Sequence, residues 1–415
     1  MGLLTVADVQ EAMDKEGKLT LIEATANKKR LLKRAFDSKA WQQMAQSDDW
    51  NTFCAEEAEW LDDYALYMAI KEAFGGKAWT EWDADIRDRK PSALAKWREK
   101  LAREIDYYRF EQYLFERQWQ ELRMQARRFA VKIIGDLPIF VAHSSADVWA
   151  NPHLFELDEV GRPTAVAGVP PDYFSEEGQL WGNPLYRWDV MKKDNYAWWT
   201  MRMKRTLAQV DIVRLDHFRG FEAYWRVDAN EKTAINGKWV KGPCEDLFIA
   251  LEKACGKLPV IAEDLGTITD EVNELRMKLG LPGMKILHFD LDTQSEVPLR
   301  APKNSVLYTG THDNNTTVGW LTEDLTPRDR DAVRRALMRT VGDETSDARL
   351  AIRFAYASNA DTVIVPMQDV LELGTTARMN LPGTIEGNWS WRMPKGSLTQ
   401  ERAAFLRGIT NEYDR

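Results

Sequence analysis

The sequence is poor in the residues that build metal sites and disulfide frameworks. Its 415 residues include three cysteines (Cys54, Cys244 and Cys255) and five histidines. The cysteines are widely separated, which excludes a Cys-x-x-Cys zinc or redox motif, and their odd number gives no disulfide framework. No two histidines stand at the spacing of a helical metal-binding pair. The composition therefore predicts a protein of a reducing compartment without a metal site.

Positive charge and long apolar runs are also scarce. The chain has 56 Lys and Arg against 65 Asp and Glu, a net charge of −9, whereas proteins that bind nucleic acid usually carry a basic excess. No apolar run approaches the roughly 18 residues of a membrane span. The start, MGLLTVADVQ, lacks the basic and apolar regions of a signal peptide, and Val6 stands where a myristoylation signal needs Ser or Thr. We therefore expect a cytoplasmic protein that binds neither nucleic acid nor a membrane.

The sequence does have 17 tryptophans and two halves of different texture. Residues 1–130 are rich in Lys, Glu, Ala and Gln and predict helices almost throughout. After residue 130, short apolar runs alternate with helical stretches such as 245–255, 269–279 and 328–341. The apolar runs, each of which stops at a polar cluster, are 131–141, 211–218, 258–266, 284–292, 304–315 and 361–370.

Apolar strands that alternate with helices indicate an α/β protein with a parallel sheet covered on its faces. No Gly-x-Gly-x-x-Gly motif follows any of these runs, which disfavours a dinucleotide-binding fold. We predict a (β/α)8 barrel of the TIM type over 131–415, with 1–130 as a helical insertion subdomain. The segment 142–190 has no obvious regular structure, and we expect it to be a long active-site loop.

Acidic residues stand where three of the predicted strands end: Asp216, Glu263 and Asp313. The chemistry of such barrels lies at the carboxyl ends of their strands. A retaining reaction at a glycosidic bond needs one carboxylate as nucleophile and one carboxyl group as acid/base, and a third can stabilise positive charge. Arg214 shares a strand face with Asp216 and would keep it ionised, and His312 is placed to donate a hydrogen bond to a sugar hydroxyl. Because a lone Asp is usually a turn or cap residue, the residues alone leave a polar-substrate hydrolase and a transferase both open.

Three neighbouring polar residues have a structural interpretation. Asp264, beside Glu263, is either part of the site or only a structural hydrogen-bond acceptor. We interpret His217 and His288 as packed residues or as supports of the site.

Several longer stretches carry a family resemblance. They are GDLPIFVAHSSADVWANPHLF (135–155), VAGVPPDYFSEEGQLWGNPLYRWDV (166–190), VRLDHFRGFEAYW (213–225), AEDLG (262–266), LPGMKILHF (281–289), YTGTHDNNTTVGW (308–320), PMQDVLELGTTARMNLPG (366–383) and GNWSWR (387–392). Together they resemble amylomaltase, the 4-α-glucanotransferase or disproportionating-enzyme family of the α-amylase clan. The resemblance covers 131–392 and, more loosely, the helical part before it.

The resemblance implies a hexosyltransferase that moves α-1,4-glucan segments between maltooligosaccharides, starch-like glucans and glucose by a retaining double displacement, with no metal or organic cofactor. It implies Asp216 as nucleophile, Glu263 as general acid/base and Asp313 as stabiliser of the transition state, with Arg214 and His312 beside them. Further sugar contacts are implied at matching positions, namely Asp172, Tyr173, Gln179, Trp181, Phe289 and Asn380.

The sequence departs from the family pattern at its front. Members of the family begin with a barrel strand that carries a TSLPSPYG-like motif and with a second strand after it, and this sequence has neither. We therefore expect a barrel without its first two strands. Besides the transferase, a retaining α-glucan hydrolase and an inactive or partner-dependent glucan-binding fragment stay open. The sequence sets no oligomeric state.

Overall fold

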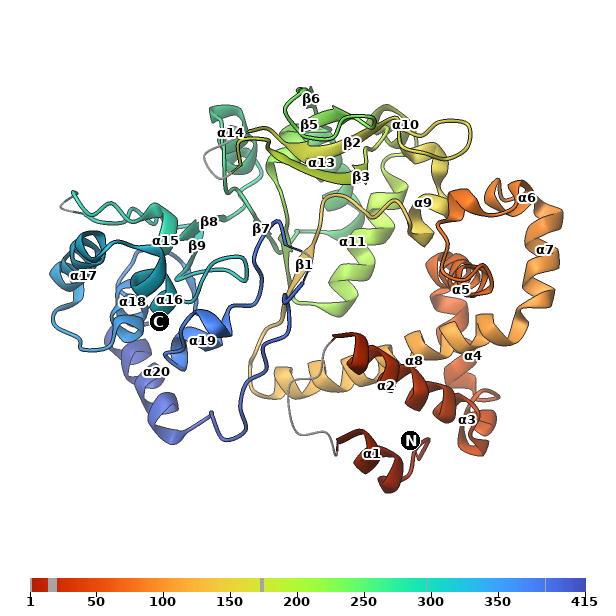
Figure 1. Ribbon diagram of the computed structural model, residues 1–415, viewed down its shortest axis with the longest axis horizontal. Helices are drawn as coiled ribbons and strands as arrows, with labels where there is room; N and C mark the ends of the chain where they lie inside the picture. Colours follow the sequence, from red (N-terminus) through yellow and green to blue (C-terminus); the bar gives the residue numbers. More distant parts are fainter. Residues whose placement is uncertain (1, 14–20, 172–174, 296, 385) are drawn as a thin grey trace. The chain divides into compact units, whose positions relative to one another are not determined.

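The computed structural model describes residues 2–13, 21–171, 175–295, 297–384 and 386–415 (Figure 1). The chain forms two compact units. Unit 1 comprises Met1–Glu16 and Ile22–Val260, and unit 2 comprises Gly17–Leu21 and Ile261–Arg415. In the part of the chain that the structure describes, no helix is long and apolar enough to cross a membrane.

The first third of unit 1 is built from helices, as the sequence predicts. Its described elements are α1 (Val6–Met13), α2 (Leu21–Phe36), α3 (Lys39–Met44), α4 (Asp48–Glu56), α5 (Ala58–Ala73), η1 (Trp79–Glu81), α6 (Ala84–Arg87), α7 (Pro91–Lys100) and α8 (Ala102–Arg128).

Serine caps and aromatic packing explain why these helices form. The side chains of Ser38 and Ser47 accept hydrogen bonds from backbone N–H groups in the first turns of α3 and α4. These N–H groups have no hydrogen-bond partner within the helix, so the serine caps stabilise both helix starts. Buried rings then hold the helices together, for example Trp41 against Phe110 of α8 with ring centroids 4.4 Å apart. The early tryptophans therefore serve mainly in packing.

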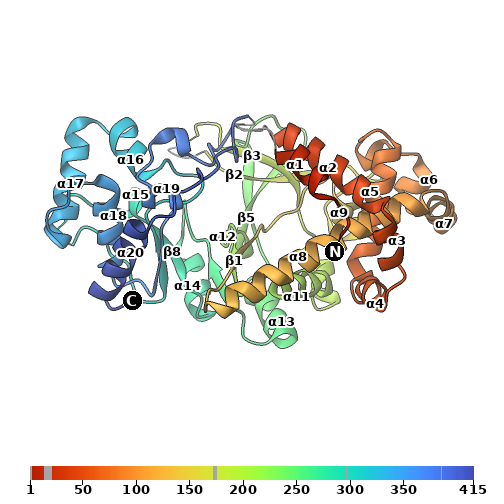
Figure 2. The ribbon, with the colours of Figure 1, turned by 90° about the horizontal axis from the view of Figure 1, so that it is seen from below.

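Helix α8 is tied to the strand region of unit 1 near the end of α11 (Ala197–Gln209) (Figure 2). The Trp119 indole donates a 2.7 Å hydrogen bond to the Gln209 carbonyl. The buried Arg123 forms a 3.1 Å ion pair with Asp211, whose other carboxylate oxygen accepts a 2.9 Å hydrogen bond from the Ile133 N–H. These contacts fix where the first parallel strand begins.

All six predicted strands are present, in two sheets. β1 (Ile134–Leu137) pairs in parallel with β4 (Ile212–Leu215), and the order of this sheet is β1-β4-β7, with β7 at Val260–Ala262. In unit 2, β8 (Gly283–Ile286), β9 (Ser305–Tyr308) and β10 (Thr362–Ile364) are parallel in the order β10-β9-β8. The α/β class is confirmed, while closure into a barrel stays a prediction.

The three helical stretches that the sequence predicts between these strands are present as α13 (Glu245–Cys255), α14 (Asp270–Lys278) and α17 (Pro327–Val341). Further described helices are α12 (Arg219–Glu222), α15 (Leu287–Asp290), α16 (Thr317–Gly319), η3 (Trp320–Asp324), α18 (Asp347–Tyr356) and, after β10, α19 (Met367–Val370), η4 (Thr375–Ala377) and the C-terminal α20 (Gln400–Glu412). In unit 2, side chains from α15, η3, α17 and α18 form one core cluster: Leu287, Leu321, Val333, Leu337, Leu350, Ala351 and Phe354.

The expectation that 142–190 lacks regular structure is wrong. The segment contains α9 (Ala146–Ala150), η2 (Pro152–Leu154), β2 (Ala165–Val169), β3 (Gln179–Pro184) and α10 (Trp188–Lys193). Strands β2 and β3 belong to an antiparallel sheet of order β3-β2-β5-β6, with β5 at Ala223–Asp228 and β6 at Gly237–Lys241. Gly168 is needed there, because a Cβ atom would lie 2.5 Å from the Gln179 carbonyl oxygen. The short strand β2 is stabilised by pairing with the distant β5, which local sequence patterns do not reveal.

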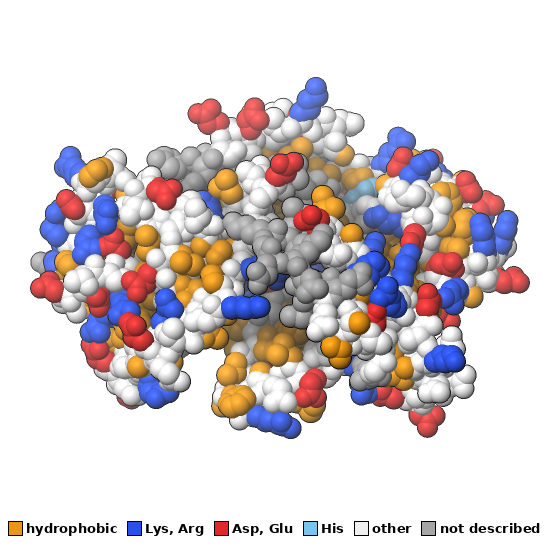
Figure 3. All heavy atoms as spheres, turned by 60° about the horizontal axis from the view of Figure 1, so that its bottom comes forward, with side chains coloured by type: hydrophobic (Ala, Val, Ile, Leu, Met, Phe, Trp, Pro, Cys, Tyr) orange, Lys and Arg blue, Asp and Glu red, His pale blue; other side chains and the backbone are white. Residues whose placement is uncertain are grey.

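Positive and negative side chains are interspersed among the described residues on the face drawn in Figure 3. The three cysteines are free, and none lies in a disulfide.

Candidate functional site

Strand β4 places Arg214 and Asp216 side by side in unit 1. Val213 and Leu215 of this strand are buried, so Arg214 lies on its other face, and Asp216 directly follows the strand. The guanidinium Nη1 of Arg214 is 3.1 Å from Oδ1 of Asp216. The predicted pairing is confirmed, and the positive charge favours the ionised form of the Asp216 carboxylate.

A second carboxylate, which the sequence analysis missed, also contacts this arginine. Asp136 of β1 is the register partner of Arg214, and its Oδ1 accepts a 2.7 Å hydrogen bond from Nη1. The motif GDLPIF contained the residue, but only the pairing of β1 with β4 brings it to Arg214. Arg214 is therefore held by carboxylates from two neighbouring strands.

Trp181 and Gln179 of β3 form a further group with His217. The Trp181 indole donates a 3.2 Å hydrogen bond to Oε1 of Gln179. The Trp181 ring also meets the His217 ring edge to face, with centroids 4.8 Å apart, and the tryptophan is 37% exposed. Burial, with a smaller contribution from Arg219, lowers the pKa of His217 to about 3. His217 is therefore a neutral packing partner at physiological pH, as expected, and Trp181 keeps part of its surface open to a ligand.

Glu263 and Asp264 follow β7 directly and have different environments. Glu263 is 9% exposed, and its Oε1 accepts a 2.8 Å hydrogen bond from the Leu265 N–H. Asp264 accepts a 2.7 Å hydrogen bond from the Met284 N–H and lies 3.0 Å from Nε of Arg276. Burial is the largest influence on Asp264 and raises its pKa. Asp264 therefore has a structural role, because it joins β7 to β8. Of these two neighbouring acids, Glu263 is the candidate catalytic carboxyl group.

Asp313 lies in the loop after β9, where three polar groups surround it. Nδ2 of Asn380 donates a 2.6 Å hydrogen bond to Oδ1 of Asp313, and Nε2 of His312 is 3.3 Å from Oδ2. Arg378 fixes the same loop by donating a 2.6 Å hydrogen bond to the Asp313 backbone carbonyl. The predicted residues His312, Asp313 and Asn380 thus form one cluster, to which the structure adds Arg378.

Trp389 is another residue that the sequence analysis did not assign. Its ring lies 5.2 Å from the His312 ring, and it is 53% exposed. The signal was present in the GNWSWR motif, but nothing in the sequence indicated which loop residue reaches His312. Trp389 therefore offers an open aromatic surface beside the Asp313 cluster.

Phe289 lies on α15 and is 58% exposed, so its ring is available to a ligand. The neighbouring His288 is packed instead, with its ring 4.3 Å from the Trp320 ring and its Nε2 3.2 Å from the Thr317 hydroxyl. Burial lowers the pKa of His288 to about 3. This agrees with the interpretation of His288 as a packed residue.

The predicted residues fall into the two units as follows. Unit 1 holds the Arg214–Asp216 pair and the Gln179–Trp181 pair, and unit 2 holds Glu263, Phe289 and the cluster of His312, Asp313 and Asn380. Asp172 and Tyr173 lie outside the described residues. Among the residues that the structure describes, no group of three or more His, Cys, Asp or Glu side chains could hold a metal ion.

Comparisons with known proteins point to one family. The sequence profile of 4-alpha-glucanotransferase matches residues 4–399. The chain is 48% identical to the 4-alpha-glucanotransferase of Synechocystis sp., over 95% of this chain and 79% of that protein. It is 46% identical to the one of Thermus thermophilus, over 92% of this chain and 78% of that protein. The structure of amylomaltase from Streptococcus agalactiae in complex with acarbose is similar with a TM-score of 0.92 at 38% identity, and covers 100% of this chain and 84% of that one.

Proposed function

Because the chain belongs to the 4-alpha-glucanotransferase family, we propose that it transfers α-1,4-glucan segments through the three acids Asp216, Glu263 and Asp313. The observation that carries the proposal is the family match over residues 4–399. It is supported by the position of Asp216 and Glu263, each of which directly follows a strand of the sheet β1-β4-β7.

We propose in addition that the six predicted strands belong to a (β/α)8 barrel over 131–415, with 1–130 as a helical insertion. The similarity to the Streptococcus agalactiae amylomaltase supports this architecture. A cytoplasmic location stays a prediction from the sequence.

Asp216 is the nucleophile in this proposal. Attack on an anomeric carbon requires an ionised carboxylate, and Arg214 at 3.1 Å favours that form. Asp136 at 2.7 Å from the same guanidinium restrains the arginine, so that the position of Asp216 is fixed before substrate binds. The attack gives a covalent glucosyl–enzyme intermediate on Asp216.

Glu263 is the general acid and then the general base. A proton donor to the leaving glycosidic oxygen has to be neutral at the start, and in this proposal the donor is the carboxyl group of Glu263, which is 9% exposed. The Leu265 N–H holds Oε1 in place. In a retaining reaction the two carboxyl groups act about 5–5.5 Å apart across the sugar.

Asp313 stabilises the positive charge that develops on the sugar ring. Its 2.6 Å hydrogen bond from Asn380 and its contact with His312 hold the carboxylate in one orientation, and a charge that is oriented in advance stabilises a transition state without reorganisation. We propose that four further family positions contact glucosyl units of the donor, namely Asp172, Tyr173, Gln179 and Trp181. Phe289 and Asn380 are further sugar-contacting positions in this proposal.

The reaction then proceeds in two displacements. Glu263 protonates the glycosidic oxygen while Asp216 attacks, and the acceptor-side fragment leaves. The 4-hydroxyl of a second glucan or of glucose, deprotonated by Glu263, displaces Asp216 and restores the α configuration. The steps use carboxyl groups alone and call for no metal or organic cofactor. Transfer outcompetes hydrolysis if the site favours a sugar over water as the acceptor, which exposed aromatic surfaces can provide.

Incubation with maltotriose tests the proposal. Transfer gives glucose together with a ladder of oligosaccharides longer than maltotriose, whereas a hydrolase gives maltose and glucose without longer products. Asp216→Asn should abolish both while maltoheptaose binding persists, and Asp85→Asn, at an exposed acid on α6, should leave the rate unchanged. Full turnover by the Asp216→Asn variant would refute the nucleophile assignment.

A further inference from the structure

The loop that carries Asp313 is held at both of its ends by one carboxylate, that of Asp369 on α19. Thr309 stands at the start of this loop, directly after β9, and Thr317 stands at its end, where α16 begins. The hydroxyl groups of Thr309 and Thr317 donate hydrogen bonds of 2.6 and 2.8 Å to the same oxygen atom, Oδ2 of Asp369. The Thr317 backbone N–H donates a third hydrogen bond, of 2.8 Å, to Oδ1. Asp369 therefore joins the two ends of the loop to each other and to α19.

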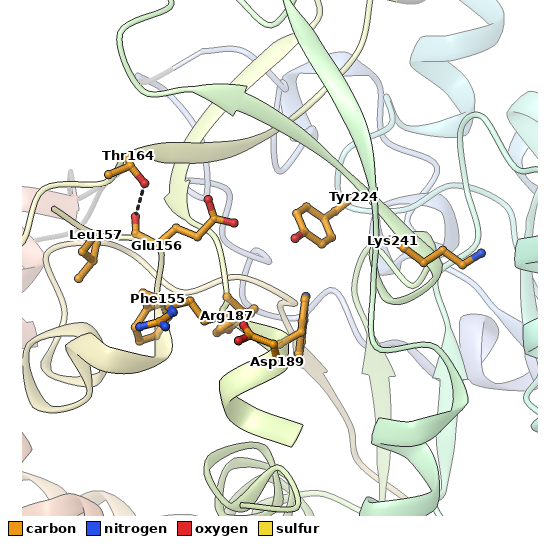
Figure 4. Close-up of a pocket in the computed structure, with 10 residues that line it drawn as sticks. Phe155, Glu156, Leu157, Thr164, Arg187, Asp189, Tyr224 and Lys241 are labelled. Carbon is orange, nitrogen blue, oxygen red and sulfur yellow. Dashed lines mark hydrogen bonds between the residues drawn. The ribbon is translucent and has the colours of Figure 1, made fainter. Parts of the chain in front are cut away.

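This cluster is buried and has no counter-charge. Thr309 and Thr317 are 0% exposed and Asp369 is 1% exposed. Burial is the largest influence on the Asp369 carboxyl group and raises its pKa, whereas the hydrogen bonds from Thr309 and Thr317 lower it. Among the described residues no charged side chain contributes to this balance. Glu156 of unit 1, drawn in Figure 4, differs in both respects, because it is more exposed and is paired with Arg226 at 3.0 Å.

Such a buried carboxylate is costly for the fold. It loses its hydration, and hydrogen bonds recover only part of that loss. An apolar side chain in the place of Asp369 would avoid the cost. What the carboxylate adds is direction, because each hydrogen bond fixes the position of its donor relative to α19. The feature is explained if the two ends of this loop have to be held in one position.

The middle of the loop is a turn that its own residues hold together. Oδ1 of Asn314 accepts hydrogen bonds of 2.9 Å from both the N–H and the hydroxyl of Thr311. The same hydroxyl accepts a 3.3 Å hydrogen bond from the Asp313 N–H, and the Asp313 side chain is 44% exposed. A turn with these internal bonds takes its orientation from its ends. A shift at Thr309 or Thr317 therefore moves the carboxylate of Asp313.

The residue before Asp369 on α19 supports the second loop at Asp313. Gln368 is 7% exposed, and its Nε2 donates a 3.2 Å hydrogen bond to the Ala377 backbone carbonyl. Arg378 and Asn380, which both donate hydrogen bonds to Asp313, follow Ala377 in the chain. The two loops that meet at Asp313 are therefore both attached to α19.

We propose that Asp369 is a positioning residue of the transfer reaction, which places the carboxylate of Asp313 by fixing both ends of its loop. The inference deepens the proposed function and rests on it, because Asp313 needs one defined position only if it stabilises charge on the sugar. Asp369 itself does not touch the sugar. A misplacement of about 1 Å at a reacting group can cost about 100-fold in rate.

Thr309→Val tests this with little change in shape, because it replaces one hydroxyl by a methyl group and removes the hydrogen bond to Asp369. We expect kcat on maltotriose to fall about tenfold, with KM changed by less than about twofold. Thr309→Ser keeps the hydroxyl and should retain most of the activity. Val333→Ala, in the core cluster of unit 2, is the matched control for lost stability and should leave kcat unchanged.

A double-mutant cycle tests whether Thr309 acts through Asp369. Asp369→Ala should lower kcat by at least about tenfold. Because both changes cut the same connection, adding Thr309→Val to Asp369→Ala should cost nothing further, whereas independent losses would multiply. Multiplied losses would overturn the proposal. If circular dichroism shows that Asp369→Ala does not fold, the comparison of Thr309→Val with Thr309→Ser and Val333→Ala decides.

A donor with a good leaving group separates Asp313 from Glu263. Fluoride leaves α-maltotriosyl fluoride without a proton from Glu263, but positive charge still develops on the sugar. The loss in Thr309→Val should therefore persist when fluoride release is measured. A loss confined to maltotriose, an unchanged kcat in Thr309→Val, or an equal loss in Val333→Ala would each overturn the proposal. Full turnover of maltotriose by Asp313→Asn would instead refute the proposed function of Asp313.

Discussion

The carboxylate of Asp136 accepts a 2.7 Å hydrogen bond from the guanidinium of Arg214, its register partner on the neighbouring parallel strand. The same guanidinium lies 3.1 Å from the Asp216 carboxylate. Asp136 therefore acts on the proposed nucleophile through Arg214, as a positioning residue.

We expect Asp136→Asn to lower kcat on maltotriose by on the order of tenfold, because a loosened Arg214 misplaces Asp216. KM should change little, because Asp136 is not among the proposed sugar contacts. Steady-state rates at several maltotriose concentrations measure both constants, and Asp85→Asn is the control. An unchanged kcat would show that Asp136 does not position Asp216.

Removing the amide of Asn380 should disorient Asp313. Asn380→Ala deletes the 2.6 Å hydrogen bond to Oδ1 of Asp313, and we expect a fall in kcat of about tenfold, which corresponds to about 1.4 kcal/mol of transition-state stabilisation. Asn380→Asp should cost more, because two carboxylates would then face each other. Asn388→Ala, in the same loop region, separates this effect from loop disorder: equal losses in both alanine variants would contradict the assignment.

Trp389 should contribute to sugar binding beside His312. Its ring lies 5.2 Å from that of His312 and is half exposed. Aromatic contacts of this kind are worth about 0.5–1.5 kcal/mol, so Trp389→Ala should lower kcat/KM by about two- to tenfold, mainly through KM. Trp389→Phe should restore most of the loss. Steady-state rates at several maltotriose concentrations give KM and kcat for each variant. An unchanged KM for the alanine variant would exclude a contact between Trp389 and the sugar.

His288 should make the fold sensitive to acid. Burial lowers its pKa to about 3, whereas the unfolded value is about 6.5, so the unfolded state binds the proton first as the pH falls. Stability is complete above about pH 6.5 and declines toward pH 3 by up to about 1 kcal/mol per pH unit.

His288→Phe keeps an aromatic ring against Trp320 and removes this titration. The stability of the variant relative to the parent should therefore rise as the pH falls from 6.5 to 4, measured by urea unfolding at each pH. A constant difference across that range would show that His288 titrates normally in the folded protein.

The six apolar runs and the helices between them were predictable because each carries its own signal. The run 211–218 contains β4 and the stretch 245–255 coincides with α13, since a covered parallel strand is apolar throughout and an amphipathic helix repeats every three to four residues. The ends of the apolar runs likewise predicted that Asp216 and Glu263 follow strands. The pairing of Arg214 with Asp216 also followed from the period of two along a strand.

Other features depend on partners that are distant in sequence. β2 is recognisable only through its pairing with β5, and Asp136 reaches Arg214 only because β1 lies beside β4. Trp389 lies beside His312, and Asn380 donates a hydrogen bond to Asp313. Both contacts join separate loops, and a loop has no periodic sequence pattern from which its path could be predicted.

The sequence by itself therefore indicated the family, the six apolar strands with the main helices between them, and the candidate acids, because motifs and periods are local properties of the chain. Only the tertiary structure decided which side chains restrain those acids. Such contacts arise from strand register and loop packing between segments that are far apart along the chain.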